Sequence, residues 1–349
     1  MEELTLNVLA VIPLSSGLVT GGVRTQARQT VNHLEKLGVN VKLFNPWDPV
    51  SPKNYDLIHV FQAGINTLSA VRQAAGSGVP LAVSPVFYTR RSPVSIKSAI
   101  HLESLIKPFI QGIVSEFGIK AEICRSASIV LPNTKDEAQL IEKGFGIDSE
   151  KIYPVPNGVN AEFIHAKPDL FFRKFGLKNF VLFVGDASSK RKNLIKLIRA
   201  FETIEHDLII IGSFKNDSYS KKCLDLANKN DRILLIDTVA HNDPILASAF
   251  AAARVFVLPS QFETPGIAAL EAALAGCKIA ITECGGTREY FGEESFYLNP
   301  ASVSSIKKAV IQAIDAKKDD RLKNRILENY TWEIIAGKTL QAYQRILQK

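Results

Sequence analysis

The sequence is poor in cysteine, and none of its four cysteines stands at a spacing typical of a metal site. Cys124, Cys223, Cys277 and Cys284 include no Cys-x-x-Cys pair and have no histidine at ligand spacing. This argues against a zinc site and indicates reduced thiols in a cytoplasmic protein. The chain lacks an apolar run of about 18 residues, so no segment is predicted to span a bilayer. Its acidic start, Met1-Glu2-Glu3, favours a first strand over a secretory signal.

The composition is that of an ordinary globular protein with a mild basic excess. Hydrophobic residues make up 46% and charged residues 22% of the 349 positions. At about 150 residues per domain, this length suits two domains. The net charge of +7 favours an anionic ligand or an anionic membrane surface over a nucleic acid, because no basic and aromatic motif of the familiar nucleic-acid modules is present. No short sequence repeat indicates a solenoid.

Strand-like and helix-like segments alternate along the chain, which predicts an α/β fold with two doubly wound domains. In the first half, strands are expected at 6–12, 39–44, 55–61, 81–84, 128–131 and 151–155, and helices at 23–37, 65–75, 94–118 and 134–143. Residues 157–178 lack periodicity and are interpreted as the connection. In the second half, strands are expected at 180–184, 208–211, 233–236, 255–258, 278–282 and 296–298, and helices at 192–201, 218–229, 243–253 and 266–275 and in much of 302–348. Ligands of such sheets bind at the carboxyl ends of the strands.

The first strand-end loop carries Gly21-Gly22 just before a helix. Paired glycines let backbone amides approach a ligand closely, and a helix N-terminus attracts anions. The loop contains neither a Gly-x-Gly-x-x-Gly fingerprint nor a Walker lysine. A flexible turn without a ligand remains the alternative.

Three cations, Lys190, Arg191 and Lys192, follow the first strand of the second half. Cations at the start of a helix oppose the helix dipole, so this placement makes sense where a phosphate lies among them. A solvated basic turn is the alternative.

Two glutamates are spaced across the loop and helix that follow strand 255–258. Glu263 lies in the loop, Pro265-Gly266 form a turn, and Glu271 lies in an otherwise apolar helix. Five residues of helix from Gly266 to Glu271 span about 7.5 Å, so the two carboxylates can address different parts of one ligand. Glu271 needs a hydroxyl or cation partner if it is buried; a partly exposed helix position is the alternative. A further glycine pair, Gly285-Gly286, follows strand 278–282.

Together these loops resemble those of the family 4 retaining glycosyltransferases, and the resemblance runs nearly from end to end. It is carried by Gly21-Gly22, by Pro132-Asn133-Thr134, by the stretch from Ile152 to Val159, by Glu263 and Glu271 with seven residues between them, and by Tyr330-Thr331-Trp332-Glu333. It implies the GT-B architecture, with two Rossmann-like domains facing a central cleft. Residues 1–160 would bind the acceptor, 161–330 the nucleotide-sugar donor, and 331–349 would form a helix that crosses back to the first domain.

The resemblance also assigns roles to residues of the second domain. Glu263 would hold hydroxyls of the donor sugar, and Glu271 the ribose hydroxyls. Thr264, Pro265, Gly266 and Ile267 would contact the donor, with the amides around Gly266 on its diphosphate. Arg191 and Lys192 would neutralise the leaving diphosphate.

The implied reaction is metal-independent and retaining, and no cofactor is expected. Gly21 and Gly22 would belong to the donor site, where Gly22 lets the first-domain loop close. The sequence has no Asp-x-Asp triplet, which agrees with protein cations in place of a metal. Retention would proceed by a same-face displacement of the nucleotide from a UDP- or GDP-hexose. The partners would be a nucleotide sugar and a glycan or lipid-linked acceptor, as in polysaccharide or O-antigen synthesis.

Two departures from the family pattern leave other functions open. Asp186 stands where many relatives have an arginine, and the segment from Ser84 to Arg91 has no histidine. Tyr88 or Arg90 would then take an acceptor or sugar contact. The alternatives are a GT-B-shaped sugar-nucleotide 2-epimerase, against which the missing histidine counts, and a non-catalytic nucleotide-sugar-binding relative.

The segment 94–117 has an apolar face with basic residues beside it. Its apolar residues are Val94, Ile96, Ile100, Ile106, Phe109, Ile110, Ile113 and Phe117, and the basic residues on or before it are Arg90, Arg91, Lys97, His101 and Lys107. A basic amphipathic helix can lie on an anionic membrane, so a peripheral contact at the inner face of a membrane is one expectation. The other is a helix that packs on its own sheet.

Overall fold

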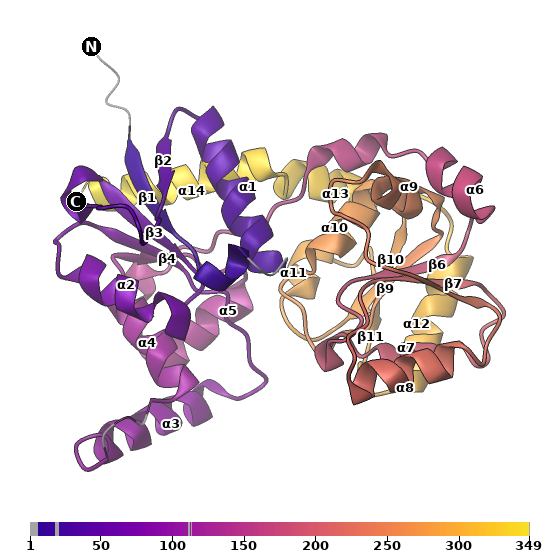
Figure 1. Ribbon diagram of the computed structural model, residues 1–349, viewed down its shortest axis with the longest axis horizontal. Coiled ribbons are helices and arrows are strands. Elements are labelled where there is room, and N and C mark those ends of the chain that lie inside the picture. Colours follow the sequence, from indigo (N-terminus) through magenta and orange to yellow (C-terminus); the bar gives the residue numbers. More distant parts are fainter. Residues whose placement is uncertain (1–5, 18–20, 111, 113, 349) are drawn as a thin grey trace. The chain divides into compact units, whose positions relative to one another are not determined.

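The computed structural model describes residues 6–17, 21–110, 112 and 114–348. The chain divides into two compact units (Figure 1). Unit 1 comprises Met1–Gly158 and Trp332–Lys349, and unit 2 comprises Val159–Thr331. The boundaries expected from the sequence, at 160 and 330, lie within two residues of these positions. No helix in the described part of the chain is long and apolar enough to cross a membrane.

Unit 1 is built on a parallel sheet with the strand order β2-β1-β3-β4-β5. Its strands are β1 (Asn7–Val11), β2 (Asn40–Leu43), β3 (Leu57–Phe61), β4 (Leu81–Ser84) and β5 (Ile129–Val130). Val8 lies opposite both Val41 of β2 and Leu57 of β3. Strand β1 therefore pairs with β2 on one side and with β3 on the other, and the strand order changes direction there. This order is that of a doubly wound sheet, which confirms the predicted fold class for this unit.

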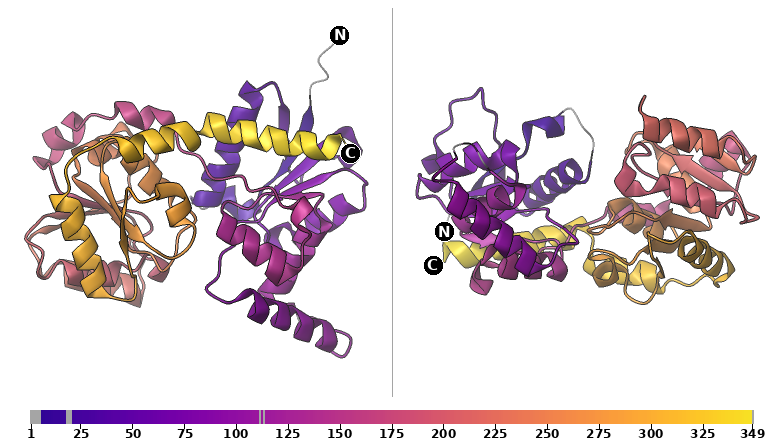
Figure 2. Two further views of the ribbon diagram at one scale, coloured as in Figure 1. Left: turned by 180° about the vertical axis from the view of Figure 1, so that it is seen from behind. Right: turned by 90° about the horizontal axis from the view of Figure 1, so that it is seen from below.

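Alternate residues of β1 face two different helix layers. Val8 and Ala10 belong to clusters with residues of α1 (Gly22–Lys36) and α14 (Trp332–Leu347), which lie side by side (Figure 2). Leu9 and Val11 pack with α2 (Ile65–Ala75) and α4 (Glu116–Ser126). Because side chains of a strand alternate between faces, a run that is apolar throughout predicts a sheet covered on both sides.

The single helix predicted over 94–118 is wrong, because the structure has two helices there. Helix α3 (Pro93–Ile106) ends before Pro108, which has no N–H to continue a helix. Helix α4 begins after Ser115, whose side chain accepts a hydrogen bond from the Gly118 amide. The apolar residues expected on one face are therefore divided between two helices and their connection, and Ile113 lies outside the described residues.

The end of the first half also differs from the expectation. Thr134 caps α5 (Lys135–Leu140) as predicted, and its hydroxyl accepts from the Glu137 amide at 3.0 Å. The helix continues to Phe145 as a wider π-helical turn. The predicted strand 151–155 is reduced to one isolated bridge between Val130 and Ile152, after which the amides of Tyr153 and Val155 donate to the carbonyls of Val130 and Pro132 at 2.9 Å each.

Unit 2 contains a second parallel sheet, with the order β11-β10-β9-β6-β7-β8. Its strands are β6 (Val181–Val184), β7 (Leu208–Ile211), β8 (Ile233–Ile236), β9 (Val255–Leu258), β10 (Lys278–Thr282) and β11 (Phe296–Leu298). Its helices are α6 (Asp169–Phe175), α7 (Leu194–Ala200), α8 (Ser218–Ala227), α9 (Pro244–Ala252), α10 (Ile267–Leu274), α11 (Thr287–Phe291), α12 (Val303–Asp315) and α13 (Arg321–Asn329).

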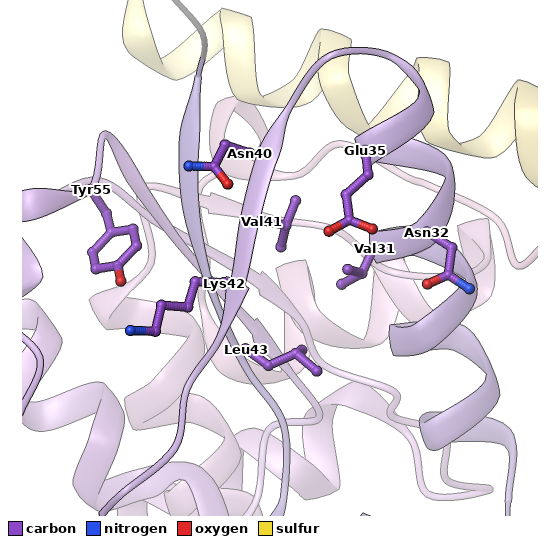
Figure 3. Close-up of a pocket in the computed structure, with 8 residues that line it drawn as sticks. All are labelled: Val31, Asn32, Glu35, Asn40, Val41, Lys42, Leu43 and Tyr55. Atoms are coloured by element: carbon purple, nitrogen blue, oxygen red, sulfur yellow. The ribbon is translucent and has the colours of Figure 1, made fainter. Parts of the chain in front are cut away.

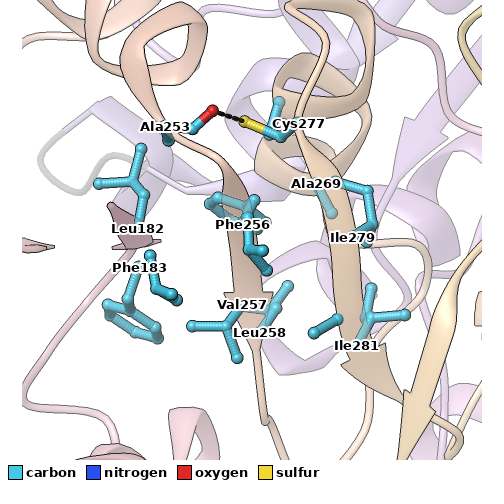
Figure 4. Packing of buried hydrophobic residues seen from close by; sticks show 14 of the residues in the cluster. Leu182, Phe183, Ala253, Phe256, Val257, Leu258, Ala269, Cys277, Ile279 and Ile281 are labelled. Atoms are coloured by element: carbon cyan, nitrogen blue, oxygen red, sulfur yellow. Dashed lines mark hydrogen bonds between the residues drawn. The ribbon is translucent and has the colours of Figure 1, made fainter. Parts of the chain in front are cut away.

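The core of unit 2 centres on β9 (Figure 4). Phe256 and Val257 are fully buried between Leu182 of β6 and Ile279 of β10. Each such side chain stabilises the fold by roughly 1.5–3 kcal/mol. The Cys277 thiol at the rim of this core lies 3.0 Å from the Phe250 carbonyl oxygen, and burial raises its pKa to about 12. This cysteine is therefore an inert packing residue.

Residues 157–178 are not a bare connection, as the sequence suggested, but largely part of unit 2. They include a short 3-10 helix at Ala161–His165 and helix α6, which packs on α9. Phe171 of α6 is buried, and its amide donates to the Ser248 hydroxyl at 2.9 Å. With only seven residues, α6 is too short to show a clear helical period in the sequence.

A buried histidine ties α14 to the sheet of unit 1. In His59 of β3, Nδ1 lies 2.7 Å from the Tyr343 hydroxyl and Nε2 lies 2.9 Å from the Ser84 hydroxyl. Both hydroxyls can serve a neutral imidazole as donor or acceptor. Burial lowers the pKa of His59 from 6.5 to about 3, because the charged ring cannot be hydrated there.

We predict that His59 makes unit 1 sensitive to acid. Below pH 6.5 the unfolded chain protonates this histidine while the native chain does not. Its contribution to the free energy of unfolding is thus complete above pH 6.5 and falls by about 1.4 kcal/mol per pH unit toward pH 3. Chemical denaturation measures the free energy of unfolding of the wild type and of His59→Gln. The difference between the two should narrow at this rate as the pH falls. The exposed His101→Gln is the control, and a gap independent of pH would contradict the prediction.

Candidate functional site

Three loops at the carboxyl ends of neighbouring strands meet in unit 2. They follow β6 (185–193), β9 (259–266) and β10 (283–286), and β9 lies between the other two strands. The backbone of Gln261 donates to the Arg191 carbonyl at 2.8 Å, and Glu263 forms an isolated bridge with Gly285. The strand order therefore brings together three segments that are separated by up to about 100 residues in the sequence.

Glu263 is the centre of this group. It is 5% exposed, and its Oε1 accepts hydrogen bonds from Lys192 Nζ at 2.7 Å and Arg191 Nη1 at 3.1 Å. Burial opposes ionisation of this carboxyl, but the charges of Lys192 and then Arg191 outweigh it and hold the pKa of Glu263 below its usual range. The cluster of one carboxylate and two cations, here called the Glu263 cluster, has a net charge of +1.

The backbone around Glu263 is fixed from the β10 loop. The Glu263 amide donates to the Cys284 carbonyl at 3.1 Å, and the Gly286 amide donates to the Glu263 carbonyl at 3.1 Å. Gly285 has a φ of 93°, and a Cβ there would lie 2.2 Å from the Glu263 carbonyl oxygen. Only glycine fits this position, which explains the first glycine of the pair that follows β10 in the sequence.

The N-terminus of α10 begins in the same loop. After Thr264 and Pro265, Gly266 occupies the cap position with a φ of 89° and offers no side chain to the first amides of the helix. Ile267 is the first helical residue and is partly exposed. An uncapped helix start carries a partial positive charge and N–H groups that point outward, which suits a phosphate.

Glu271 lies one turn further along α10 and is buried, so the alternative of a partly exposed position is wrong. Its Oε1 is 2.6 Å from Nε2 of His241, which comes from the loop between β8 and α9 and is about half exposed. His241 thus supplies the partner that a buried carboxylate needs. No sequence pattern indicates His241 as a partner of Glu271, because His241 stands alone in a polar loop 30 residues before it.

Asn193 is a second residue that the sequence analysis missed. It is buried in the left-handed conformation with a φ of 60°, and its Nδ2 donates to the carbonyls of Pro259 at 3.0 Å and Pro300 at 2.8 Å. It therefore joins the loop after β6 to the loop after β9, directly beside Lys192. The only sequence signal is that asparagine tolerates this conformation better than most residues.

The other predicted site residues belong to unit 1. Gly21 precedes α1 and Gly22 opens it, while residues 18–20 of the same loop lie outside the described residues. A Cβ on either glycine would meet no atom within 4 Å, so packing within the described chain does not require glycine there. Tyr88 packs partly buried against the β3–β4 core, and Arg90 is exposed.

Residues 170–329, nearly all of unit 2, match the family described as glycosyl transferases group 1. This segment is a group 1 glycosyltransferase domain. The matched segment contains all three loops of the Glu263 cluster and both Glu263 and Glu271. It also contains His241 and Asn193, the two residues that sequence reasoning did not find.

Curated relatives of this glycosyltransferase are distant. An MMP alpha-(1->4)-mannosyltransferase of Mycolicibacterium hassiacum is 22% identical over 85% of this chain and 72% of its own length. A D-inositol 3-phosphate glycosyltransferase of Paenarthrobacter aurescens is 25% identical over 74% and 67%, respectively. The O-antigen chain mannosyltransferase RfbU of Salmonella typhimurium is 28% identical over 58% and 55%, so the match spans about half of that relative.

Solved structures share the fold over nearly the whole chain. A sucrose-phosphate synthase from Thermosynechococcus elongatus has a TM-score of 0.78 at 19% identity, covering 98% of this chain and 99% of the other. HepE of Anabaena, solved with UDP and glucose, has a TM-score of 0.63 at 17% identity, covering 98% of both chains. These likenesses confirm the GT-B fold class.

In unit 1 of the glycosyltransferase, Glu137 fixes the loop that carries Tyr88 and Arg90. Its Oε1 accepts from the Phe87 amide at 2.6 Å, and its Oε2 accepts from the Asn133 amide at 2.7 Å. Burial raises the pKa of Glu137 to about 7, although these two bonds favour the ionised form. Glu137 is thus a structural clamp between the ends of β4 and β5.

Unit 1 also has an open recess of about 560 Å³ between α1 and the free edge of β2 (Figure 3). Its lining consists of Val31, Asn32, Glu35, Asn40, Val41, Lys42, Leu43 and Tyr55. With one cation and one carboxylate in this lining, it lacks the positive surplus of the Glu263 cluster. It is therefore a weaker candidate for an anionic ligand.

We predict that Gly285→Ala disrupts the cluster by displacing Glu263. The substitution combines a left-handed backbone with a clash against the Glu263 carbonyl oxygen, whereas Gly276 has a φ of 96° and open space around it. Gly276→Ala should cost about 1–2 kcal/mol from backbone strain alone, and Gly285→Ala at least about 2 kcal/mol more. Chemical denaturation of both variants measures the difference. Equal losses of stability would contradict this account of Gly285.

Proposed function

We propose that this glycosyltransferase moves a hexose, with retention and without a metal ion, from a UDP- or GDP-linked donor to a glycan or lipid-linked acceptor. The observation that carries the proposal is the Glu263 cluster, which has a net positive charge and whose Glu263 lies in the loop that leads into α10. A diphosphate leaving group needs such a site, because negative charge grows on it as the bond to the sugar breaks.

Names and titles of similar proteins support a nucleotide-sugar donor. HepE was solved with UDP and with UDP-glucose, and a UDP-forming trehalose-phosphate synthase of Burkholderia xenovorans shares the fold with a TM-score of 0.64. RfbU is named for O-antigen chain synthesis, and an Escherichia coli relative for transfer to a diphosphoundecaprenol-linked acceptor. We therefore take UDP-hexoses as the first donors to test and a lipid-linked glycan as the acceptor class.

The proposed roles follow from the charges. Lys192 and Arg191 neutralise the departing diphosphate, and the α10 amides near Ile267 bind its oxygens. The bond from the anomeric carbon to the phosphate oxygen breaks, and a bond to the acceptor oxygen forms on the same face. The acceptor proton passes to a phosphate oxygen of the donor. Protein cations thus act from fixed positions, with little reorganisation during the reaction.

The two glutamates act as binding groups in this proposal. A Glu263 carboxyl with a lowered pKa is ionised at neutral pH, so it can accept hydrogen bonds from sugar hydroxyls but cannot act as a general acid. The two-carboxylate scheme of glycoside hydrolases therefore does not apply. Glu271 accepts hydrogen bonds from the ribose hydroxyls. Because His241 already contacts Oε1 of Glu271, this histidine must share the carboxylate with the ribose or move aside.

We predict that one nucleotide family stabilises the enzyme in the presence of a chelator. A ligand that binds only the native state raises the apparent melting temperature with its concentration. Thermal shifts with UDP, GDP, ADP and their sugar conjugates identify the donor, and Glu271→Gln should weaken binding about tenfold. The exposed Glu328→Gln in the same unit is the matched control.

The anomeric configuration of the sugar that is first released on hydrolysis of the best donor shows whether the reaction retains or inverts configuration. We expect the anomer of the donor, as in a retaining transfer. Release of the opposite anomer, formation of a 2-epimer or absence of any nucleotide shift would contradict the proposed function.

We predict that Lys192→Met lowers the turnover of donor hydrolysis by about 100-fold, with a smaller change in KM, because its charge acts mainly on the leaving group. The substitution also removes the charge that contributes most to lowering the pKa of Glu263, so this pKa rises. The loss of turnover relative to the wild type should therefore grow as the pH falls. Lys190→Met, in the same turn but exposed, is the matched control. Wild-type turnover in Lys192→Met would refute this role.

A further inference from the structure

A buried hydrogen-bond network in unit 1 joins α1 to the loops that follow β4 and β5. Glu137 of α5 is fully buried, and its two oxygens accept from the amides of Phe87 and Asn133. The Asn133 side chain extends the network, because its Oδ1 accepts from Nε2 of Gln26 at 2.9 Å. Gln26 lies in α1, four residues after Gly22, and is 5% exposed. Three segments that are distant in the sequence are thus linked by groups that water does not reach.

The backbone just before Phe87 is strained. Val86 has a φ of 52°, in the left-handed region, where a β-branched side chain is a rare outlier. Such a conformation persists only where neighbouring contacts enforce it. The Pro85 carbonyl accepts from the Ala63 amide at 3.0 Å, and the Phe87 amide donates to Glu137 at 2.6 Å. The Glu137 carboxylate therefore helps to hold this bend, which we call the Val86 bend.

The Val86 bend sets the course of the segment after it. The Phe87 ring is buried against the rings of Phe117 and Phe145, with centroids 6.1 and 5.0 Å away. This contact keeps the ring in the core when the backbone changes. A change at the bend therefore redirects the residues that follow, which include Tyr88 and Arg90.

We propose that Glu137 is a positioning residue of the acceptor site, whose carboxylate holds the Val86 bend so that Tyr88 and Arg90 are placed for the acceptor. The inference rests on the proposed function and on the acceptor or sugar contact expected of Tyr88 or Arg90. Glu137 binds backbone amides of its own chain, so it acts through this segment and not on a substrate.

The carboxylate holds both amides only while it is ionised. An ionised carboxyl accepts on both oxygens, whereas a protonated one carries an O–H that faces one of the two N–H donors. Since Asn133 is tied to Gln26 while Val86 is strained, the bond to Phe87 is the one that breaks. The held bend thus binds a proton on Glu137 less tightly than the released bend does, so protonation favours release.

The change of charge falls near neutral pH. Burial raises the pKa of Glu137 to about 7, against the two backbone bonds and the charge of Lys120. Lys120 of α4 donates to the Ala63 carbonyl at 2.9 Å and pairs with Glu116 at 3.2 Å. Cys124 of α4 also acts on Glu137, but burial and the charge of Glu137 raise the pKa of this thiol, which stays neutral. The network therefore changes its charge at Glu137 around pH 7.

The first test measures the order of the segment without any substrate. Hydrogen exchange of residues 85–91, read by mass spectrometry and corrected for the intrinsic rate, reports how often the bend opens. Protection in the wild type should be about fivefold lower at pH 6 than at pH 8. Glu137→Gln has a single acceptor oxygen, so its protection should be low at both pH values. Asp136→Asn, at the exposed neighbouring position of α5, is the matched control and should behave like the wild type.

The second test separates positioning from donor binding. Its acceptor is alpha-D-GlcNAc-diphosphoundecaprenol, which the name of an Escherichia coli relative specifies. Glu137→Gln should raise the acceptor KM at pH 8 about tenfold, because only a fraction of the molecules holds the bend. Donor hydrolysis and the thermal shift with the nucleotide should not change. The acceptor KM of the wild type should rise between pH 8 and pH 6, and that of Glu137→Gln should stay constant.

The two tests keep this inference apart from the proposed function. Absence of donor hydrolysis counts against the proposed function, whereas the exchange measurement needs no substrate and still decides the role of Glu137. The wild-type pH profile also needs no variant, so it holds even if Glu137→Gln destabilises unit 1.

Three results would overturn the proposal. The first is corrected exchange of residues 85–91 in the wild type that is the same at pH 6 and pH 8. The second is Glu137→Gln with the protection of the wild type at pH 8. The third is an unchanged acceptor KM in Glu137→Gln despite lost protection, which would show that the bend does not serve the acceptor.

Discussion

A buried carboxylate must be compensated, and in this protein that requirement organises the three strand-end loops of unit 2 around Glu263. Glu263 lies among Lys192, Arg191 and backbone groups, and the two cations outweigh the cost of its burial. The pairing fixes the loop after β6 against the loop after β9. The bridge to Gly285 then fixes the loop after β10. Glu263 thus holds three strand ends in one arrangement, through its side chain and through its backbone.

The same requirement gives the site its chemistry. Two cations facing one carboxylate leave a single positive charge that the protein itself does not neutralise within the cluster. Asn193 holds the turn that carries both cations, and its two bonds to backbone carbonyls make that turn rigid. In the proposed function, a diphosphate that binds at the start of α10 would meet charges that are already in place, which is the condition for stabilising a leaving group.

Much of this arrangement could be predicted from the sequence, and the misses have physical reasons. The strands of unit 2 are continuous apolar runs, so their positions were clear, as were the spacing of Glu263 and Glu271 and the glycine pair after β10. The pairing between distant loops could not be predicted from the sequence, because His241 and Asn193 act through tertiary contacts that leave no periodic pattern in it. The break between α3 and α4 was missed because apolar residues on two helices looked like one face, although Pro108 marked the end of the first.

The central claim is that the Glu263 cluster supplies its surplus positive charge to a diphosphate. Calorimetric titration of the wild type with a nucleoside diphosphate and the matching monophosphate, both in the presence of a chelator, tests this directly. The account predicts that the diphosphate binds at least about tenfold more tightly, because only its second phosphate reaches Lys192 and Arg191. Equal affinities for the two nucleotides would contradict it.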